Sequence, residues 1–232
     1  LASQAIADGS SVKVIGGAGN DSVTFDLSSL GESAPKPQIS VVGGGGNDTL
    51  SVIARHGDSV GWHLDGQGGG DINGAAQILF SSVEHLDGGS EDDTIYGSTL
   101  DINWLVNGAN SGSVGAYFFD GFENLVGATN SNDIFSVTSD GSLHGFLDGG
   151  NGGYDTLVLD TGAVQNLLST ATSSHDGSIA YDGRLVSYRG LEPVTIAGVQ
   201  ANITFDISAL DGNWSGNNVA RLHYVTSLSM ME

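Results

Sequence analysis

Glycine and aspartate recur together in short segments that lie between apolar runs. The aspartates that close these segments are Asp21, Asp48, Asp71, Asp93, Asp133 and Asp155, and the first four segments open with Gly16, Gly43, Gly66 and Gly88. Glycine permits a sharp reversal of the chain, and an aspartate after it adds an anionic oxygen among exposed carbonyls. Ca2+ takes roughly six to eight oxygen ligands of these two kinds. The pattern therefore predicts calcium sites shared between neighbouring turns, with these ten residues as candidate ligands.

The spacing of the turns predicts the fold that would position them. Successive closing aspartates lie 27, 23, 22, 40 and 22 residues apart, a recurrence typical of stacked coils. Short runs such as Val12–Ile15, Leu50–Ile53 and Ile134–Val137 are rich in β-formers, and no helical period is sustained. We therefore expect an all-β chain forming a parallel β-helix or β-roll solenoid with coils of about 22 residues. A β-sandwich is the alternative.

The turns and the segments after them, such as Asp21-Ser-Val-Thr-Phe and Asp48-Thr-Leu-Ser-Val, carry a family resemblance. They resemble the G-G-x-G-x-D-x-U-x repeats of RTX (hemolysin-type calcium-binding) proteins, in the looser form found in giant bacterial surface and adhesin-like proteins. The resemblance covers residues 12–160 and implies bacterial export, a parallel β-roll or β-helix, and calcium between successive Gly/Asp turns. Family repeats follow one another directly, whereas this chain has one turn per coil. At most one edge would then carry calcium, and the opposite edge would consist of ordinary loops.

The charge balance narrows the classes of partner. The 232 residues include 27 acidic and 6 basic ones, and no Lys or Arg occurs in residues 56–183. Nucleic acids and anionic membranes bind basic surfaces, and no apolar run is long enough to span a bilayer, so we expect neither nucleic acid binding nor membrane insertion. Acidity that merely keeps a repeat protein soluble is the alternative to calcium binding. The start at Leu1 favours a segment cut from a larger polypeptide.

Two further features concern the organisation of the chain. Residues 1–160 are expected to form the Gly/Asp-turn solenoid, and residues 161–232 degenerate coils or a C-terminal cap of the same elongated domain. A second element recurs around Glu84, Glu123 and Glu192, each of which lies between apolar residues. These glutamates are either additional ligands or exposed strand residues between inward-facing neighbours, and the second interpretation is favoured.

Enzyme classes receive little support from the sequence. The six histidines show no metal-ligand spacing, and nucleophile-elbow, phosphate-loop and zinc motifs are absent. Trp62, Trp104 and Trp214 are the residues that could stack on sugar rings, although core packing is the default for lone aromatics.

We therefore predict a non-enzymatic, calcium-stabilised structural or interaction module of a large secreted bacterial surface protein, serving as stalk, adhesin or surface-layer component. Its partners would be neighbouring repeats of the parent chain, with surface glycans or self-association as further candidates. The first alternative is a carbohydrate-binding or polysaccharide-processing β-helix, which a line of exposed aromatics along one sheet face would favour. The second is an export and folding segment attached to a secreted enzyme.

Overall fold

The computed structural model describes residues 5–7, 9–30 and 35–212. This part is all-β, as predicted, and its nineteen strands form one mostly parallel sheet. The strands are β1 (Ser11–Ile15), β2 (Ser22–Asp26), β3 (Gln38–Val42), β4 (Thr49–Ile53), β5 (Ser59–Leu64), β6 (Gly69–Asn73), β7 (Gln77–Ser81), β8 (His85–Asp87), β9 (Asp92–Tyr96), β10 (Asn103–Gly108), β11 (Ser111–Val114), β12 (Tyr117–Asp120), β13 (Asn124–Val126), β14 (Ile134–Val137), β15 (Phe146–Asp148), β16 (Thr156–Ala171), β17 (Gly177–Tyr181), β18 (Arg184–Arg189) and β19 (Val194–Asp206), and the 3-10 helix η1 (Ser208–Gly212) follows.

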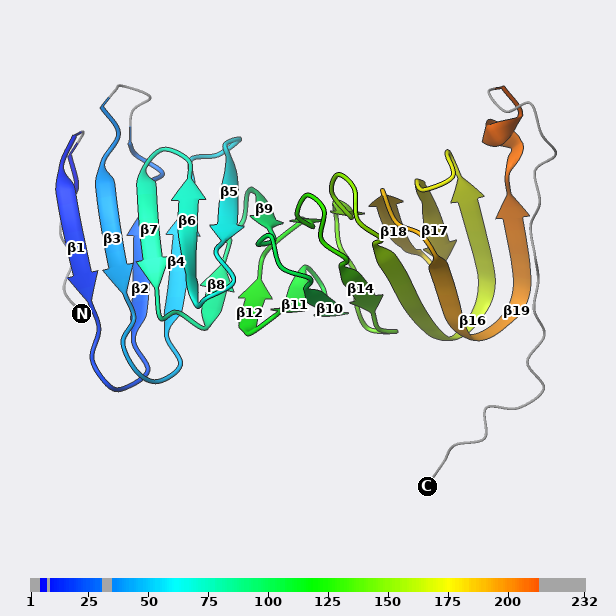
Figure 1. Ribbon diagram of the computed structural model, residues 1–232, viewed down its shortest axis with the longest axis horizontal. Coiled ribbons are helices and arrows are strands. Elements are labelled where there is room, and N and C mark those ends of the chain that lie inside the picture. Colours follow the sequence, from blue (N-terminus) through cyan, green and yellow to red (C-terminus); the bar gives the residue numbers. More distant parts are fainter. Residues whose placement is uncertain (1–4, 8, 31–34, 213–232) are drawn as a thin grey trace.

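The strands fall into two hydrogen-bonded series that follow the long axis of the molecule (Figure 1). The first series has the order β1, β3, β7, β6, β5, β9, β13, β15, β18 and β17. The second has the order β2, β4, β8, β12, β11, β10, β14, β16 and β19. The C-terminal half of β16 also pairs with β17, which joins the two series into one sheet.

Antiparallel excursions interrupt the parallel pairing at three places. They are β5–β6–β7, β10–β11–β12 and β16–β17–β18, and in each the chain moves ahead along the axis and then returns strand by strand. These excursions explain why the repeat length varies. Ile134 pairs with Thr156, which lies 22 residues later as predicted. Gln38, in contrast, pairs with Gln77, because β5 and β6 lie between them in the chain.

Two edges connect the series. The first edge carries the connections from the first series to the second, at residues 16–21, 43–48, 82–84, 97–102, 127–133, 149–155 and 190–193. The second edge carries the return connections, at residues 27–30 and 35–37, 54–58, 88–91, 121–123 and 138–145. The Gly/Asp turns therefore do not share one edge: the turn from Gly88 to Asp93 lies on the second edge, where ordinary loops were expected.

The core lies between the inward-facing side chains of successive strands. In β4 and β5, for example, every second residue is buried. The largest buried side chains are aromatic: Trp62 lies edge-on to Phe122 with 5.3 Å between ring centroids, and Trp104 stacks on Phe135 at 5.2 Å. The expectation that Trp62 and Trp104 pack in the core is confirmed. Trp214 lies outside the described residues.

Candidate functional site

The Gly/Asp turns of the first edge stack on one another at very short range. A Cβ atom added to Gly16 would lie 1.9 Å from the carbonyl oxygen of Gly43, and one added to Gly43 would lie 1.8 Å from that of Ser82. The same holds on the second edge, where a Cβ at Gly88 would lie 2.4 Å from the carbonyl oxygen of Gly121. Real side chains cannot approach a backbone oxygen so closely. The opening glycines are therefore required for backbone stacking, whatever ions the turns hold.

The closing carboxylates of the first edge bind the backbone of the neighbouring turn. The backbone N–H of Asp21 donates to Asp48 Oδ1 at 2.7 Å, and the N–H of Asp48 donates to Glu84 Oε2 at 2.9 Å. Asp21 Oδ2 accepts the N–H of Gly17 within its own turn at 2.7 Å. We call this arrangement the carboxylate ladder: the aspartate of one turn donates its amide to the carboxylate of the next. Hydrogen bonds to charged acceptors contribute more than neutral ones, so the ladder fastens adjacent turns.

A second stretch of the ladder lies farther along the same edge. The N–H of Ile102 donates to Asp133 Oδ1 at 2.8 Å, and the N–H of Asp133 donates to Asp155 Oδ1 at 2.7 Å. Ser131 Oγ donates to Asp133 Oδ2 at 2.9 Å. Asp133 and Asp155 therefore hold stacked turns together, although their segments carry one residue more than the others. Burial raises the pKa of both carboxyls, that of Asp155 to about 6.

Asp93, on the second edge, differs from the ladder aspartates. Its N–H donates to Glu123 Oε2 at 2.8 Å, and Glu123 Oε1 accepts the side-chain amide of Asn110 at 2.6 Å. The Asp93 side chain is fully buried, yet within the described residues neither of its oxygens has a hydrogen-bond partner. Burial, and then the negative charge of Glu123, raises the pKa of Asp93 to about 8. The nearby indole N–H of Trp62, which is also buried and does not reach hydrogen-bonding geometry, opposes the increase. This carboxyl needs a proton or a cation to compensate its burial.

Asp71 is not part of any stacked turn, which corrects the prediction for Gly66 and Asp71. Gly66 lies in the hairpin between β5 and β6 with a positive φ of 75°, and Asp71 lies within β6. There its carboxylate lies 3.4 Å from His63 Nδ1 and accepts the Asn73 side-chain amide at 2.6 Å. The sequence of this segment matches a Gly/Asp turn, but the chain reverses earlier, at the glycines, and continues as a strand. Asp48 and Asp71 therefore cannot share an ion between neighbouring turns.

The recurring glutamates lie in connections, not in strands as favoured from the sequence. Glu84 and Glu123 each accept the backbone N–H of a closing aspartate, so they occupy the place that Asp48 and Asp155 occupy elsewhere. Glu192 lies in the last connection of the first edge, and its N–H donates to the carbonyl oxygen of Asp155 at 2.6 Å. The recurrence of an apolar residue followed by glutamate, read as a turn, would have revealed this role.

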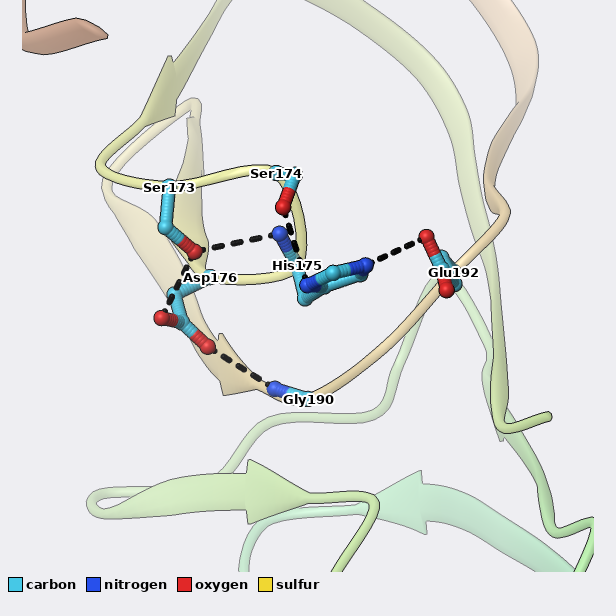
Figure 2. Close-up of polar contacts among 6 residues, drawn as sticks. All are labelled: Ser173, Ser174, His175, Asp176, Gly190 and Glu192. Carbon is cyan, nitrogen blue, oxygen red and sulfur yellow. Dashed lines mark hydrogen bonds and ion pairs between the residues drawn. The ribbon is translucent and has the colours of Figure 1, made fainter. Parts of the chain in front are cut away.

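The connection at Glu192 also holds a polar cluster formed with the loop between β16 and β17 (Figure 2). His175 Nε2 lies 2.6 Å from Glu192 Oε2, and its Nδ1 lies 2.9 Å from Ser174 Oγ. Asp176 accepts the N–H of Gly190 at 2.8 Å and the hydroxyl of Ser173 at 2.7 Å. Ser, His and Glu are the residue types of a hydrolytic triad, but the His175 and Glu192 side chains are about half exposed. The arrangement fits a clamp that holds the loop on the turn.

Metal ligation by side chains alone has little geometric support. Within the part that the structure describes, no three His, Cys, Asp or Glu side chains converge as a metal site. The ladder carboxylates already accept backbone N–H groups, which leaves Asp93 as the one of the six closing aspartates that is buried with both oxygens available. A calcium ion there would need backbone carbonyls or water for its other ligands, both of which Ca2+ accepts.

Comparison with known proteins gives no family: neither a protein-family model nor a curated protein matches the chain. Among the described residues, no helix has the length and apolarity needed to cross a bilayer.

Proposed function

We propose that this chain is an elongated parallel β-solenoid and serves as a non-enzymatic structural or interaction module of a large secreted bacterial surface protein. The observation that carries the proposal is the stacking of turns by glycine contacts and acidic side chains in two stretches of the first edge. Such stacking transmits force from coil to coil and leaves both sheet faces available to partners. Neighbouring repeats of the parent chain are the expected partners. A stalk, adhesin or surface-layer component fits this arrangement.

Small-angle scattering tests the architecture. A solenoid whose strands are spaced about 4.8 Å apart along one axis gives an elongated particle. A radius of gyration equal to that of a compact sphere of this mass would contradict the solenoid.

Calcium is the cation we propose for the second edge, at Asp93. The charge of -21 and the buried, unpartnered carboxyl of Asp93 both favour a bound cation there. Because a ligand that binds only the folded state stabilises it by mass action, calcium added to chelator-treated protein should raise the melting temperature. The increase should exceed that produced by magnesium, or by sodium at equal ionic strength. Equal effects of all three would indicate charge screening and would contradict specific coordination.

A matched set of variants locates the ion. Asp93→Asn should remove most of the calcium-dependent increase in melting temperature, whereas Asp71→Asn and Asp140→Asn should leave it intact. Asp140 is exposed and, like Asp71, lies outside the stacked turns. If Asp140→Asn lowers the calcium effect as much as Asp93→Asn does, calcium is merely condensing on an acidic surface. Metal analysis of protein purified without chelator provides an independent measurement.

The carbohydrate-binding alternative rests on a groove of about 380 Å³ beside the first edge, whose lining includes Asn20, Asn47, His85 and Phe118. The Phe118 side chain is 60% exposed and would offer a ring face to a sugar. The other exposed aromatics of the described part lie on β9, in the connection before β16 and on β19, so they form no line along one face. Affinity electrophoresis in neutral and acidic polysaccharides, with Phe118→Ala as the control, tests this alternative.

A further inference from the structure

A cavity of about 510 Å³ lies beside the second edge, among three connections of the chain. They are the connection before β3, the connection between β4 and β5, and the hairpin tip between β6 and β7. Lys36 and Arg55, the only basic residues between positions 14 and 183, both line this cavity. Asp58 is the one acidic residue among the described residues of the lining. The cavity therefore carries a net positive charge in a chain whose formal charge is -21.

The Lys36 ammonium is held in place by its surroundings. Pro35 and Pro37, two of the three prolines of the chain, flank Lys36 and restrict its backbone. Lys36 Nζ donates to the carbonyl oxygen of Gly74 at 2.6 Å. An ammonium group has three N–H donors, and this is its one hydrogen bond within the described residues, so two donors remain for a ligand. A long side chain that is fixed in advance loses less conformational entropy when a ligand binds.

A second part of the lining is the turn that contains Arg55 and Asp58. The N–H of Asp58 donates to the carbonyl oxygen of Arg55 at 2.9 Å, and Arg55 Nη2 lies 3.0 Å from Asp58 Oδ1. Gly57, between them, has a positive φ of 88°. Its N–H donates to Glu91 Oε2 at 2.7 Å, which ties the turn to the next connection. The guanidinium therefore adds a positive charge at a defined position to that of Lys36, whichever of its N–H groups are engaged.

The lining favours an anion that also carries hydroxyl groups. Two cations select a carboxylate or a phosphate, whereas the Asp58 carboxylate repels a dianion and accepts hydrogen bonds from hydroxyl groups. Ser59 offers a hydroxyl that donates or accepts, and Leu30 and Ala75 offer apolar surface to a ring. A volume of about 510 Å³ lies within the range of small-ligand pockets and exceeds what an inorganic ion fills. A sugar acid, which is a hydroxylated ring with one carboxylate, combines these properties.

The groove beside the first edge has the opposite charge. Its lining includes Asp21 and Glu84, and none of the described residues that line it is Lys or Arg. That groove therefore disfavours an anion, and a sugar acid would select the cavity at Lys36 and Arg55 instead.

We propose that the cavity at Lys36 and Arg55 binds a sugar acid, with the carboxylate of the ligand on the two cations and a hydroxyl group of the ligand on Asp58. The site goes beyond the structural role of the solenoid and depends neither on calcium at Asp93 nor on the groove at Phe118. Such a site would let an otherwise acidic surface recognise an acidic polysaccharide at one point.

Isothermal titration calorimetry of the full chain in the presence of chelator tests the proposal. The probes are a galacturonic acid trisaccharide and the neutral galactose trisaccharide, and the chelator excludes calcium bridges between acidic groups. The acidic probe should bind, and the neutral probe should not. Lys36→Gln and Arg55→Gln should each weaken binding of the acidic probe about tenfold, the loss expected for one charged hydrogen bond. Arg55→Lys keeps the charge and should weaken binding less than Arg55→Gln.

Two control variants leave the cavity intact. Lys13→Gln also removes one positive charge, but Lys13 is exposed on β1 and does not line the cavity. Phe118→Ala changes the other groove. Neither variant should alter the affinity for the acidic probe.

The remaining outcomes overturn the proposal. They include equal binding of the two trisaccharides, and unchanged binding of the acidic probe by Lys36→Gln and Arg55→Gln while far-UV circular dichroism shows an intact fold. A loss in Lys13→Gln as large as that in Lys36→Gln would reduce the binding to overall charge. Glutarate or inorganic phosphate that binds as tightly as the acidic trisaccharide would assign the cavity to simple anions. Absence of binding together with an elongated scattering profile would reject the sugar-acid site alone and leave the solenoid intact.

Discussion

The turns that close at Asp48 and Asp93 belong to the same sequence type but place their carboxylates in opposite situations. Asp48 uses Oδ1 to accept the N–H of Asp21, although its Oδ2 is buried without a hydrogen-bond partner among the described residues. Asp93 is equally buried, yet neither of its oxygens has a hydrogen-bond partner among the described residues. The difference comes from the edge on which each turn lies. Asp48 stacks between two turns of the first edge, whereas Asp93 faces the shorter connection at Glu123.

In these two turns the neighbouring connection, and not the Gly/Asp sequence itself, determines the surroundings of the closing carboxylate. A carboxylate that accepts a backbone N–H from the neighbouring turn joins the two turns by a charge-assisted hydrogen bond. A carboxylate that meets another acid is destabilised until a proton or cation arrives. The aspartate of the same motif can therefore join adjacent turns by a hydrogen bond at one position and be a titratable or cation-binding group at another.

The largest loss of stability is expected from substitutions in the carboxylate ladder. Asp48→Ala removes the acceptor for the Asp21 amide and should lower the free energy of unfolding by about 1–3 kcal/mol, because the donor loses its partner. Asp48→Asn keeps an acceptor oxygen and should change stability by less than about 1 kcal/mol. Urea denaturation at neutral pH measures both. Equal losses in the two variants would show that the charge of Asp48, and not its acceptor oxygen, matters.

Asp93→Asn, unlike Asp48→Ala, should raise the free energy of unfolding at neutral and alkaline pH. The folded-state pKa of Asp93 is about 8, above the ordinary value of 3.8. The folded chain therefore keeps a proton that the unfolded chain releases between these values, so stability falls as pH rises through this window. Without calcium, Asp93→Asn should raise the free energy of unfolding at pH 8–9 by about 1–3 kcal/mol and flatten its pH dependence. Asp140→Asn, at an exposed site, is the control. A pH profile parallel to that of the parent would contradict the assignment to Asp93.

Glu123→Gln should change the pH dependence of stability less than Asp93→Asn does. The charge of Glu123 is the second cause, after burial, of the raised pKa of Asp93. Glutamine keeps an oxygen to accept the Asp93 N–H but removes that charge. Because the repulsion is removed, the Asp93 pKa should fall by up to about one unit. The loss of stability with rising pH should therefore end at a lower pH than in the parent and be smaller, but it should not disappear as it does in Asp93→Asn. Carboxyl titration by NMR measures the pKa, and an unchanged pKa would leave burial as the sole cause.

The sequence predicted the strands better than their arrangement. The runs at Val12, Leu50 and Ile134 lie in β1, β4 and β14, because alternating apolar residues bury one face of a strand. The antiparallel excursions were missed: β6 contains two glycines and an aspartate, which read as a turn, and β8, β13 and β15 are three residues long. Local pattern cannot reveal which strand returns beside which, because that depends on contacts between residues far apart in the chain.

The candidate site was predicted in its residues but not in its geometry. The glycines and aspartates do lie where turns stack, with the exception of the Gly66–Asp71 segment. Asp48 accepts a backbone N–H, whereas Asp93 does not. This difference depends on the neighbouring connection, which the spacing of the motif does not encode. Calcium binding at these turns stays a prediction.

The smallest effect is expected at the clamp formed by the 172–176 loop and the 190–193 connection. His175 and Glu192 are about half exposed, and such ion pairs contribute little, so His175→Ala should lower the free energy of unfolding by less than about 1 kcal/mol. Asp176 accepts two hydrogen bonds, from Gly190 N–H and Ser173 Oγ, and these bonds hold its pKa below the ordinary value. Asp176→Ala should therefore cost more than His175→Ala at neutral pH. Its contribution should fade as pH falls through the Asp176 pKa, because protonation removes the charged acceptor. Urea denaturation of both variants at pH 7 and pH 3 measures the difference. A greater loss for His175→Ala would identify the imidazole, and not the aspartate, as the group that fastens the loop.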